Sequence, residues 1–144
     1  MILVPLPCAC ASLRRACRAV TQRYDRELRS TGLRATQFTL LQALSMVGEM
    51  SQATLAAVLV LDSTTLTRTL ATMSRNGWVS VKQGRDRRQR MVKITDEGRD
   101  QLAAAKAGWE RAQSRLRTAI GPRDWDELMR LLTRVAAIAQ EEGL

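Results

Sequence analysis

The fold is decided by residues 61–98, LDSTTLTRTLATMSRNGWVSVKQGRDRRQRMVKITDEG. The first part begins with a helix-capping residue, Asp62 or Ser63, and ends at Gly77, a residue type that stops helices in the left-handed conformation. WVSV and MVKI then alternate apolar and polar residues on both sides of a loop that contains Gly84. This alternation predicts a β-hairpin directly after a helix.

Another short helix is expected just before this stretch. Residues 51–60, SQATLAAVLV, carry a capping serine, Ser51, followed by mostly apolar residues. Two short helices joined by a tight turn form a helix-turn-helix. With the hairpin added, residues 35–94 are predicted to form a winged helix-turn-helix lobe.

Longer helices are expected on both sides of this lobe. Apolar residues from Leu13 to Leu28 recur at helical spacing, and the next helix covers residues 36–47 with Thr36 as its cap. Its inward residues are predicted to be Phe38, Leu41 and Leu44.

Downstream, Thr95 is the predicted cap of a long helix, and a glycine-proline pair at 121 and 122 precedes a last helix. The helices over residues 8–34 and 95–142 carry apolar seams that require a partner, and the seam of the long helix runs from Leu102 through Trp109 to Leu116. The predicted fold class is therefore mainly α with a small β-hairpin wing.

The composition indicates a globular domain with a polyanionic partner. The 144 residues are 45% hydrophobic and 26% charged, a balance too apolar for disorder. Lys and Arg number 23 against 14 Asp and Glu, which leaves a formal net charge of +9. This excess favours nucleic acid as the partner. A basic protein without an acidic partner is the alternative on charge alone.

The N-terminal segment MILVPLPCACA fits a secretory signal poorly, because it lacks basic residues and is interrupted by Pro5 and Pro7. No apolar run approaches the roughly 18 residues of a membrane span, so a cytoplasmic protein with no membrane association is expected. Three cysteines, Cys8, Cys10 and Cys17, lie near one end, and this odd number indicates thiols rather than a disulfide framework.

The helix that follows residue 61 has two distinct faces. At 100° per residue, Leu66, Leu70 and Met73 fall within about 60° of one another and are predicted to face the core. The opposite side carries small polar residues with Arg68 and Arg75, a composition that fits a major groove. The alternative is an ordinary exposed face, but five threonines between positions 64 and 72 reduce helix stability, which favours a functional surface.

The arginine-rich loop GRDRRQR, residues 84–90, lies at the predicted hairpin tip. A solvated charge run is the simpler interpretation. Because a hairpin after a recognition helix projects beside the same groove, an arginine there is placed to enter a narrow minor groove. Asp86 is repelled by phosphates, so it is expected to pair with a neighbouring arginine and hold the hairpin.

These residues resemble the MarR (multiple antibiotic resistance regulator) family of bacterial winged-helix repressors. The wing signature of that family is an Asp, an Arg two positions later, a Leu or Ile followed by Thr, and a Gly. Here Asp86, Arg88, Ile94, Thr95 and Gly98 occur at the family spacing. The resemblance extends over essentially the whole chain.

The resemblance implies a homodimer, with residues 8–34 and 95–142 as the dimerisation region, bound to a pseudo-palindromic operator in double-stranded DNA. Carried over by position, Arg88 is the minor-groove arginine and Asp86 the structural member. Pattern and resemblance together predict these DNA-binding residues: Ser63, Thr64, Thr65, Thr67, Arg68, Thr72, Arg75, Arg85, Arg87, Arg88 and Arg90.

Regulators of this family respond to a small ligand, often an anionic aromatic compound, or to cysteine oxidation. Cys10 precedes Tyr24 by fourteen positions, as in the organic-hydroperoxide-sensing branch, so the two residues are a candidate redox sensor. Two further tyrosines of that branch are replaced here by Arg14 and Ala35. Cys17 is predicted to lie in the core as a small hydrophobic residue.

A metal centre and a catalytic site are not expected. The chain has no histidine, so three cysteines leave a zinc site incomplete within one subunit, and the alternative is a site that a dimer assembles. It also has no Gly-rich phosphate loop and no pairing of nucleophile and base, so neither an enzyme nor a cofactor is predicted. The rival functions are a nucleoid-type or RNA-binding protein without sequence preference, and an interaction module whose seams bind another protein.

Overall fold

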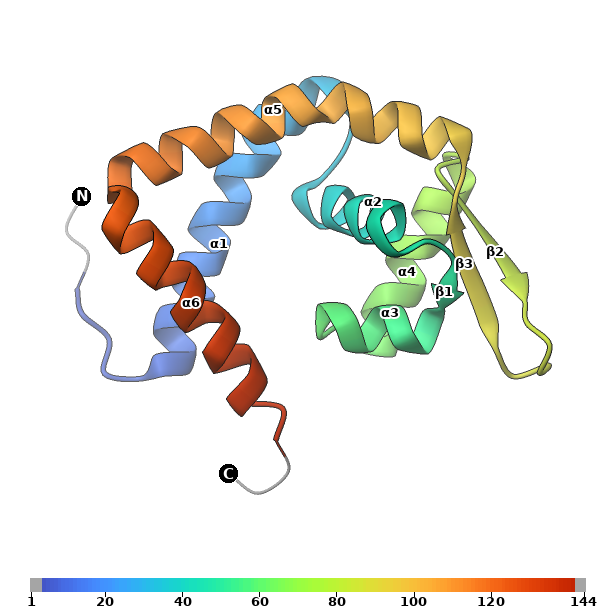
Figure 1. The fold of residues 1–144 in the computed structure, drawn as a ribbon, viewed down its shortest axis with the longest axis horizontal. Coiled ribbons are helices and arrows are strands. Elements are labelled where there is room, and N and C mark those ends of the chain that lie inside the picture. The colour runs from blue at the N-terminus through green and yellow to red at the C-terminus, as the bar shows by residue number, and fades with distance from the viewer. Residues whose placement is uncertain (1–3, 142–144) are drawn as a thin grey trace. The chain divides into compact units, whose positions relative to one another are not determined.

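The computed structural model describes residues 4–141 and contains six α-helices in that range. The elements follow the order α1 (Ala9–Leu28), η1 (Arg29–Thr31), α2 (Ala35–Val47), β1 (Met50–Ser51), α3 (Gln52–Leu59), α4 (Ser63–Arg75), β2 (Val79–Gln83), β3 (Arg90–Ile94), α5 (Asp96–Ile120) and α6 (Pro122–Ile138). They form two compact units, Met1–Trp109 and Glu110–Leu144, and the boundary falls within α5. The winged helix-turn-helix, α2 to β3, belongs to the first unit (Figure 1).

Side-chain caps start the two helices of the helix-turn-helix. The Thr54 backbone N–H donates to Ser51 Oγ at 3.0 Å, and the Thr65 N–H donates to Asp62 Oδ1 at 2.8 Å. Each bond satisfies an N–H that has no partner within its own helix. The predicted cap Ser51 is confirmed, and Asp62 rather than Ser63 caps α4.

The predicted cap of α2, Thr36, is wrong, because the helix already begins at Ala35. The Ala35 N–H donates to Asp25 Oδ1 of α1 at 2.7 Å, and the Arg34 N–H donates to Gln37 Oε1 at 2.9 Å. The first turn is therefore satisfied by a carboxylate ten residues upstream. A contact of this kind leaves no local capping signal in the sequence.

The sheet has three antiparallel strands in the order β1-β3-β2. The predicted hairpin is confirmed: β2 and β3 pair from Val79 opposite Ile94 to Gln83 opposite Arg90, and together they extend away from the helices (Figure 1). The third strand, β1, pairs Met50 with Val92 and is only two residues long. It was not predicted, since so short a segment shows no alternating pattern.

The core of the first unit collects the apolar faces of α2, α4 and the sheet. The predicted inward residues of α4, Leu66, Leu70 and Met73, are buried. So are those of α2, namely Phe38, Leu41 and Leu44. Burial of these side chains removes apolar surface from water, which is the main stabilising contribution in a lobe of this size.

The first half of α5 packs on this core. Ala105 is buried within it, and Leu102 and Trp109 pack against it. The Trp109 ring stacks on Phe38 with 5.7 Å between centroids and 16° between planes. The prediction that this part of the seam requires a separate partner is therefore wrong, because residues of α2 from the same chain cover it.

The apolar stripe of α1 is largely exposed. Leu28 is buried, whereas Leu13 and Val20 are 40% and 37% exposed. Cys17 is exposed as well, with its Sγ 4.0 Å from Thr21 Oγ1, so its predicted place in the core is wrong. Because Cys17 lies on the same stripe as Leu13 and Val20, it has no more apolar cover than they have.

In the second unit, α6 buries Trp125 and exposes large apolar side chains over its remaining length. Those exposed are Met129, Leu131, Leu132, Val135 and Ile138. Single exposed apolar residues are common, but several on one helix mark an interaction surface.

Gly98, Trp78 and Thr95 join the wing to the start of α5. Thr95 Oγ1 donates to the Gly77 carbonyl at 2.5 Å and accepts from the Gly98 N–H at 3.0 Å, which confirms Thr95 as the predicted cap. The Thr95 N–H donates to the Trp78 carbonyl at 3.1 Å. A Cβ on Gly98 would lie 2.0 Å from that carbonyl oxygen, so the approach requires glycine.

We expect Gly98→Ala to lower the free energy of unfolding by about 1–3 kcal/mol, because the added methyl group displaces backbone. Urea unfolding followed by circular dichroism measures the change. Gly84→Ala is the matched control: its Cβ would meet Gln89 Oε1 at 2.8 Å, the end of a side chain that can rotate, and Gln89 Cβ at 3.1 Å, which needs only a small shift. Equal losses of unfolding free energy in both variants would contradict a specific requirement for glycine at position 98.

Candidate nucleic-acid interface

Four of the five threonines of α4, all except Thr64, donate their hydroxyl protons within the helix or to its cap. Thr65 Oγ1 donates to Asp62 Oδ2 at 2.6 Å, and Thr67 Oγ1 donates to the Ser63 carbonyl at 2.7 Å. Thr69 and Thr72 likewise donate to the carbonyls four residues earlier, at 3.0 and 3.3 Å. These protons are already engaged, so the threonines offer methyl groups and oxygen lone pairs to a ligand rather than donors.

The charged donors on the exposed side of α4 are two arginines. Arg68 and Arg75 are both exposed, as is Thr64. Arg75 Nη2 donates to Thr72 Oγ1 at 3.2 Å, which holds its guanidinium close to the helix. Within residues 4–141, no ion pair or side-chain hydrogen bond holds Arg68, so this guanidinium is available for an acceptor outside the chain.

Asp62 stays ionised at the start of α4. Hydrogen bonds from the Thr65 hydroxyl and backbone N–H lower the pKa of its carboxyl group below the ordinary value. An anion at a helix N-terminus also interacts favourably with the helix dipole. Asp62 therefore acts in fixing the helix and is unsuited to contact a polyanion.

The hairpin tip is a structured turn over residues 84–89. The Gly84 N–H donates to the Gln89 carbonyl at 2.7 Å, and the Gln89 N–H donates to the Asp86 carbonyl at 2.9 Å. Gln83 Nε2 donates to the Arg87 carbonyl at 3.0 Å. These bonds hold the loop backbone, while the arginines at 85, 87, 88 and 90 are all exposed.

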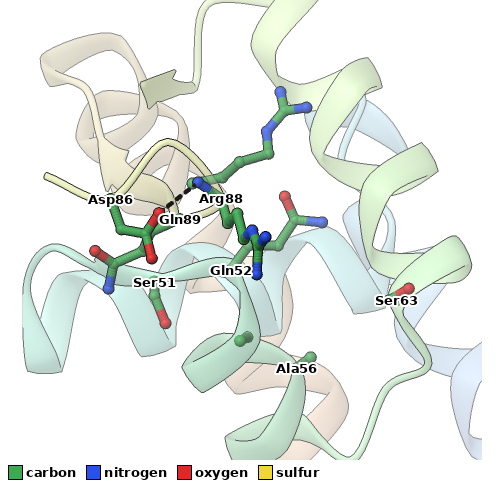
Figure 2. Close-up of a pocket in the computed structure, with 9 residues that line it drawn as sticks. Ser51, Gln52, Ala56, Ser63, Asp86, Arg88 and Gln89 are labelled. Atoms are coloured by element: carbon green, nitrogen blue, oxygen red, sulfur yellow. Dashed lines mark hydrogen bonds between the residues drawn. The ribbon is translucent and has the colours of Figure 1, made fainter. Parts of the chain in front are cut away.

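Asp86 braces this turn in a different way from the one predicted. Its Oδ1 accepts from the Arg88 backbone N–H at 3.0 Å, and no guanidinium pairs with it in the described part of the chain (Figure 2). Asp86 and Arg88 are two positions apart. At this spacing an aspartate carboxylate reaches a backbone N–H more readily than it reaches the guanidinium at the end of a long arginine side chain. The guanidinium of Arg88 consequently stays available for a ligand.

A hollow of about 530 Å³ separates the wing from the helix-turn-helix (Figure 2). Residues of α3, α4 and the wing line it: Ser51, Gln52, Ala53, Ala56, Ser63, Asp86, Arg88, Gln89 and Arg90. Of the site residues predicted from sequence, it brings together Ser63, Asp86, Arg88 and Arg90.

Sequence reasoning missed Gln52, the first residue of α3. Its Nε2 donates to Thr67 Oγ1 at 2.7 Å, which links α3 to α4. A glutamine after a capping serine carries no signal of such a contact, because its partner lies fifteen residues away.

A second hollow, of about 380 Å³, lies between α2 and α5 in the first unit. Phe38, Leu102 and Trp109 give it apolar walls, and Arg99 and Lys106 add positive charge. Gln42, Ser45 and Ala103 complete the lining. Aromatic walls with cationic groups at the edge suit a small aromatic anion.

The three cysteines are exposed, and Cys8 and Cys10 line a shallow hollow with Arg14, Arg15 and Arg18. Cys10 and Tyr24 both lie on α1, and at 1.5 Å per residue their fourteen-residue separation is about 21 Å along the helix axis. One chain therefore does not bring them together. Partial burial raises the pKa of the Tyr24 hydroxyl.

Within residues 4–141, no three His, Cys, Asp or Glu side chains gather in a way that fits a metal ion. The helices of the same part of the chain are all too short or too polar to cross a membrane.

Comparisons with known proteins place this geometry among transcriptional regulators. The model of the MarR family matches residues 33–89. YwoH of Bacillus subtilis (strain 168), an uncharacterized HTH-type transcriptional regulator, is 31% identical over 85 residues, which are 59% of this chain. The match spans 62% of YwoH, less than two thirds of its length.

Solved structures extend the similarity to almost the whole chain. The M. tuberculosis transcriptional regulator MosR in complex with DNA is 36% identical, with a TM-score of 0.86 over 95% of this chain and 99% of that one. The PcaV regulator from Streptomyces coelicolor, in complex with its natural ligand, is 20% identical, with a TM-score of 0.83 over 97% and 100% of the two chains. At 20% identity, this second likeness shows the fold alone.

Proposed function

The chain belongs to the MarR family of transcriptional regulators, and from this premise we propose that it is a homodimeric repressor that binds a pseudo-palindromic operator in double-stranded DNA. Such a protein acts in the cytoplasm, and its role is regulatory rather than catalytic. The observation that carries the proposal is the pairing of an exposed, cationic α4 with an arginine-rich wing in one lobe. The similar regulator MosR was crystallised with DNA.

In this proposal α4 and the wing contact different parts of the DNA. The start of α4, with Ser63, Thr64 and Arg68, enters the major groove, where threonine methyl groups meet thymine and Arg68 reaches guanine. Thr65, Thr67, Thr72 and Arg75 border that surface. Arg88 enters the minor groove, and Arg85, Arg87 and Arg90 contact phosphates.

Exposed apolar residues support the homodimer. Large apolar side chains are exposed on both terminal helices within the described chain. They are Leu13 and Val20 on α1, and Met129, Leu131, Leu132, Val135 and Ile138 on α6. A second copy offers the same helices, and two-fold symmetry matches a palindromic operator. In a dimer, a shift of these helices changes the spacing of the two recognition helices and releases the DNA.

The hollow between α2 and α5 supports release by a small aromatic anion. Its Phe38 and Trp109 walls fit a ring, and Arg99 fits a carboxylate. Exposed Cys10 supports oxidation as the other signal, and it lines a hollow with Arg14 and Arg15. Because α1 separates Cys10 from Tyr24 within one chain, any contact between them joins two subunits.

We expect Arg88→Ala to weaken operator binding by about 1–3 kcal/mol per subunit and to lower the salt dependence of the affinity, since the positive charge assigned to the minor groove is lost. Fluorescence anisotropy with a duplex selected from a random pool measures both, and two chains should bind per duplex. Arg123→Ala, which removes an equal charge from an exposed site on α6, serves as control.

An unchanged affinity and slope for Arg88→Ala would reject the wing assignment. Equal affinity for selected and scrambled duplexes would favour the rival nucleoid-type protein, because a specific regulator prefers its site by about 10³-fold or more.

For the ligand signal, we expect benzoate to quench tryptophan fluorescence and to release the selected duplex. Arg99→Gln should weaken both effects at least about tenfold by removing the charge that binds the carboxylate. Trp109→Phe tests whether Trp109 is the ring whose fluorescence is quenched, since Trp78 and Trp125 still fluoresce in that variant. Quenching that persists unchanged in both variants would place the benzoate elsewhere.

For the oxidation signal, we expect cumene hydroperoxide to release wild-type protein from the duplex while Cys10→Ser stays bound, because serine cannot form the sulfenic acid. Anisotropy follows the release, and dithiothreitol should restore binding. Cys17→Ser is the matched control on the same helix. Equal release of the wild type and Cys10→Ser would exclude Cys10 as the sensor.

A further inference from the structure

The hollow between the wing and the helix-turn-helix lies on the path that a DNA strand takes if the proposed function is correct. When α4 lies in a major groove and the wing in the neighbouring minor groove, the sugar-phosphate strand between those grooves passes between α4 and the wing. Ser63 of α4 and Arg88 of the wing face the hollow from its two sides (Figure 2). The strand therefore has to cross it.

The lining of the hollow suits a phosphodiester. Arg88 and Arg90 provide positive charge, and Gln52, Ser63 and Gln89 provide neutral hydrogen-bonding groups. Asp86 is the carboxylate among the lining residues, and its Oδ1 is occupied by the Arg88 backbone N–H. Phosphate contacts from arginine, glutamine and serine fix the register of a protein on DNA.

Gln52 is held in place before any DNA arrives. One N–H of its Nε2 donates to Thr67 Oγ1 at 2.7 Å, and that hydroxyl donates in turn to the Ser63 carbonyl at 2.7 Å. The amide retains a second N–H and its carbonyl oxygen. A donor fixed in this way loses less conformational entropy on binding than a freely rotating one.

We propose that this hollow is the seat of the DNA strand between the two grooves, and that Gln52, positioned by Thr67, donates its second amide N–H to a phosphate there. Arg90 supplies charge to the same strand. Thr67 is then a positioning residue that acts through Gln52, and not a base-reading residue. The inference rests on the proposed DNA-binding function and gives Gln52 a contact with the DNA backbone.

The first test compares Gln52→Ala with wild type on the selected duplex and on a scrambled one. We expect about tenfold weaker binding to both, as for loss of a hydrogen bond to a charged group, with an unchanged salt slope because glutamine carries no charge. Arg90→Ala should lower the slope. Gln22→Ala on α1 is the matched glutamine control, and thermal unfolding verifies that each variant is folded.

The second test replaces single phosphates of the selected duplex by neutral methylphosphonates. At the seated phosphate, the replacement should weaken wild type, and Gln52→Ala should then cause no further loss. Thr67→Val keeps the side-chain shape and removes the hydroxyl, so it should reduce the same coupling.

Three results would rule out the contact between Gln52 and a phosphate in this hollow. They are unchanged binding by Gln52→Ala, a loss of affinity confined to duplexes with one particular base pair, or losses of affinity that add to those of the methylphosphonate at every position. If Thr67→Val leaves the coupling intact, the positioning role is wrong. If wild-type protein binds no duplex at low salt, the proposed function itself fails, which is distinguishable from a wild type that binds while Gln52 has no effect.

Discussion

The arrangement of the lobe depends on the hydrogen bonds of Thr95. Its hydroxyl joins the Gly77 carbonyl, at the end of the α4 segment, to the Gly98 N–H in the first turn of α5. Both strands of the wing start or finish at this junction, since β2 begins one residue after Trp78 and β3 ends one residue before Thr95. One side chain thus fixes the base of the wing relative to the helix that precedes it and the helix that follows it.

The threonine-rich helix illustrates how local bonds restrict function. Five threonines between positions 64 and 72 lower the helix propensity of α4, yet four of them donate their protons to groups three or four residues earlier. The face is therefore small and methyl-rich, with few donors of its own. The charged donors of this face are Arg68 and Arg75, and the amide of Gln52 on α3 is joined to it through Thr67.

The elements predicted from sequence are those set by nearby residues. Caps such as Asp62 and the alternation of the hairpin act over a few positions, so their signals are local. The features that were missed are set over longer distances: Asp25 caps α2 from α1, and Trp109 finds its partner Phe38 in α2. The conformation of Val60 also could not be predicted from the sequence. Val60 ends α3 at a left-handed φ of 52°, a conformation that β-branched residues rarely adopt. The tight turn was predicted, but nothing marked Val60 as its strained residue.

The same long-range packing gives a route from the second hollow to the DNA-facing side. Arg99 lines the hollow between α2 and α5, and its neighbour Gly98 presses on the Trp78 carbonyl with no room for a Cβ. The first turn of α5 and Trp78 are therefore mechanically coupled, because a close-packed contact transmits displacement rather than absorbing it. Trp78 leads directly into β2 and hence to the wing tip. Gly98 therefore joins the turn of α5 that borders this hollow to the residue that leads into the wing.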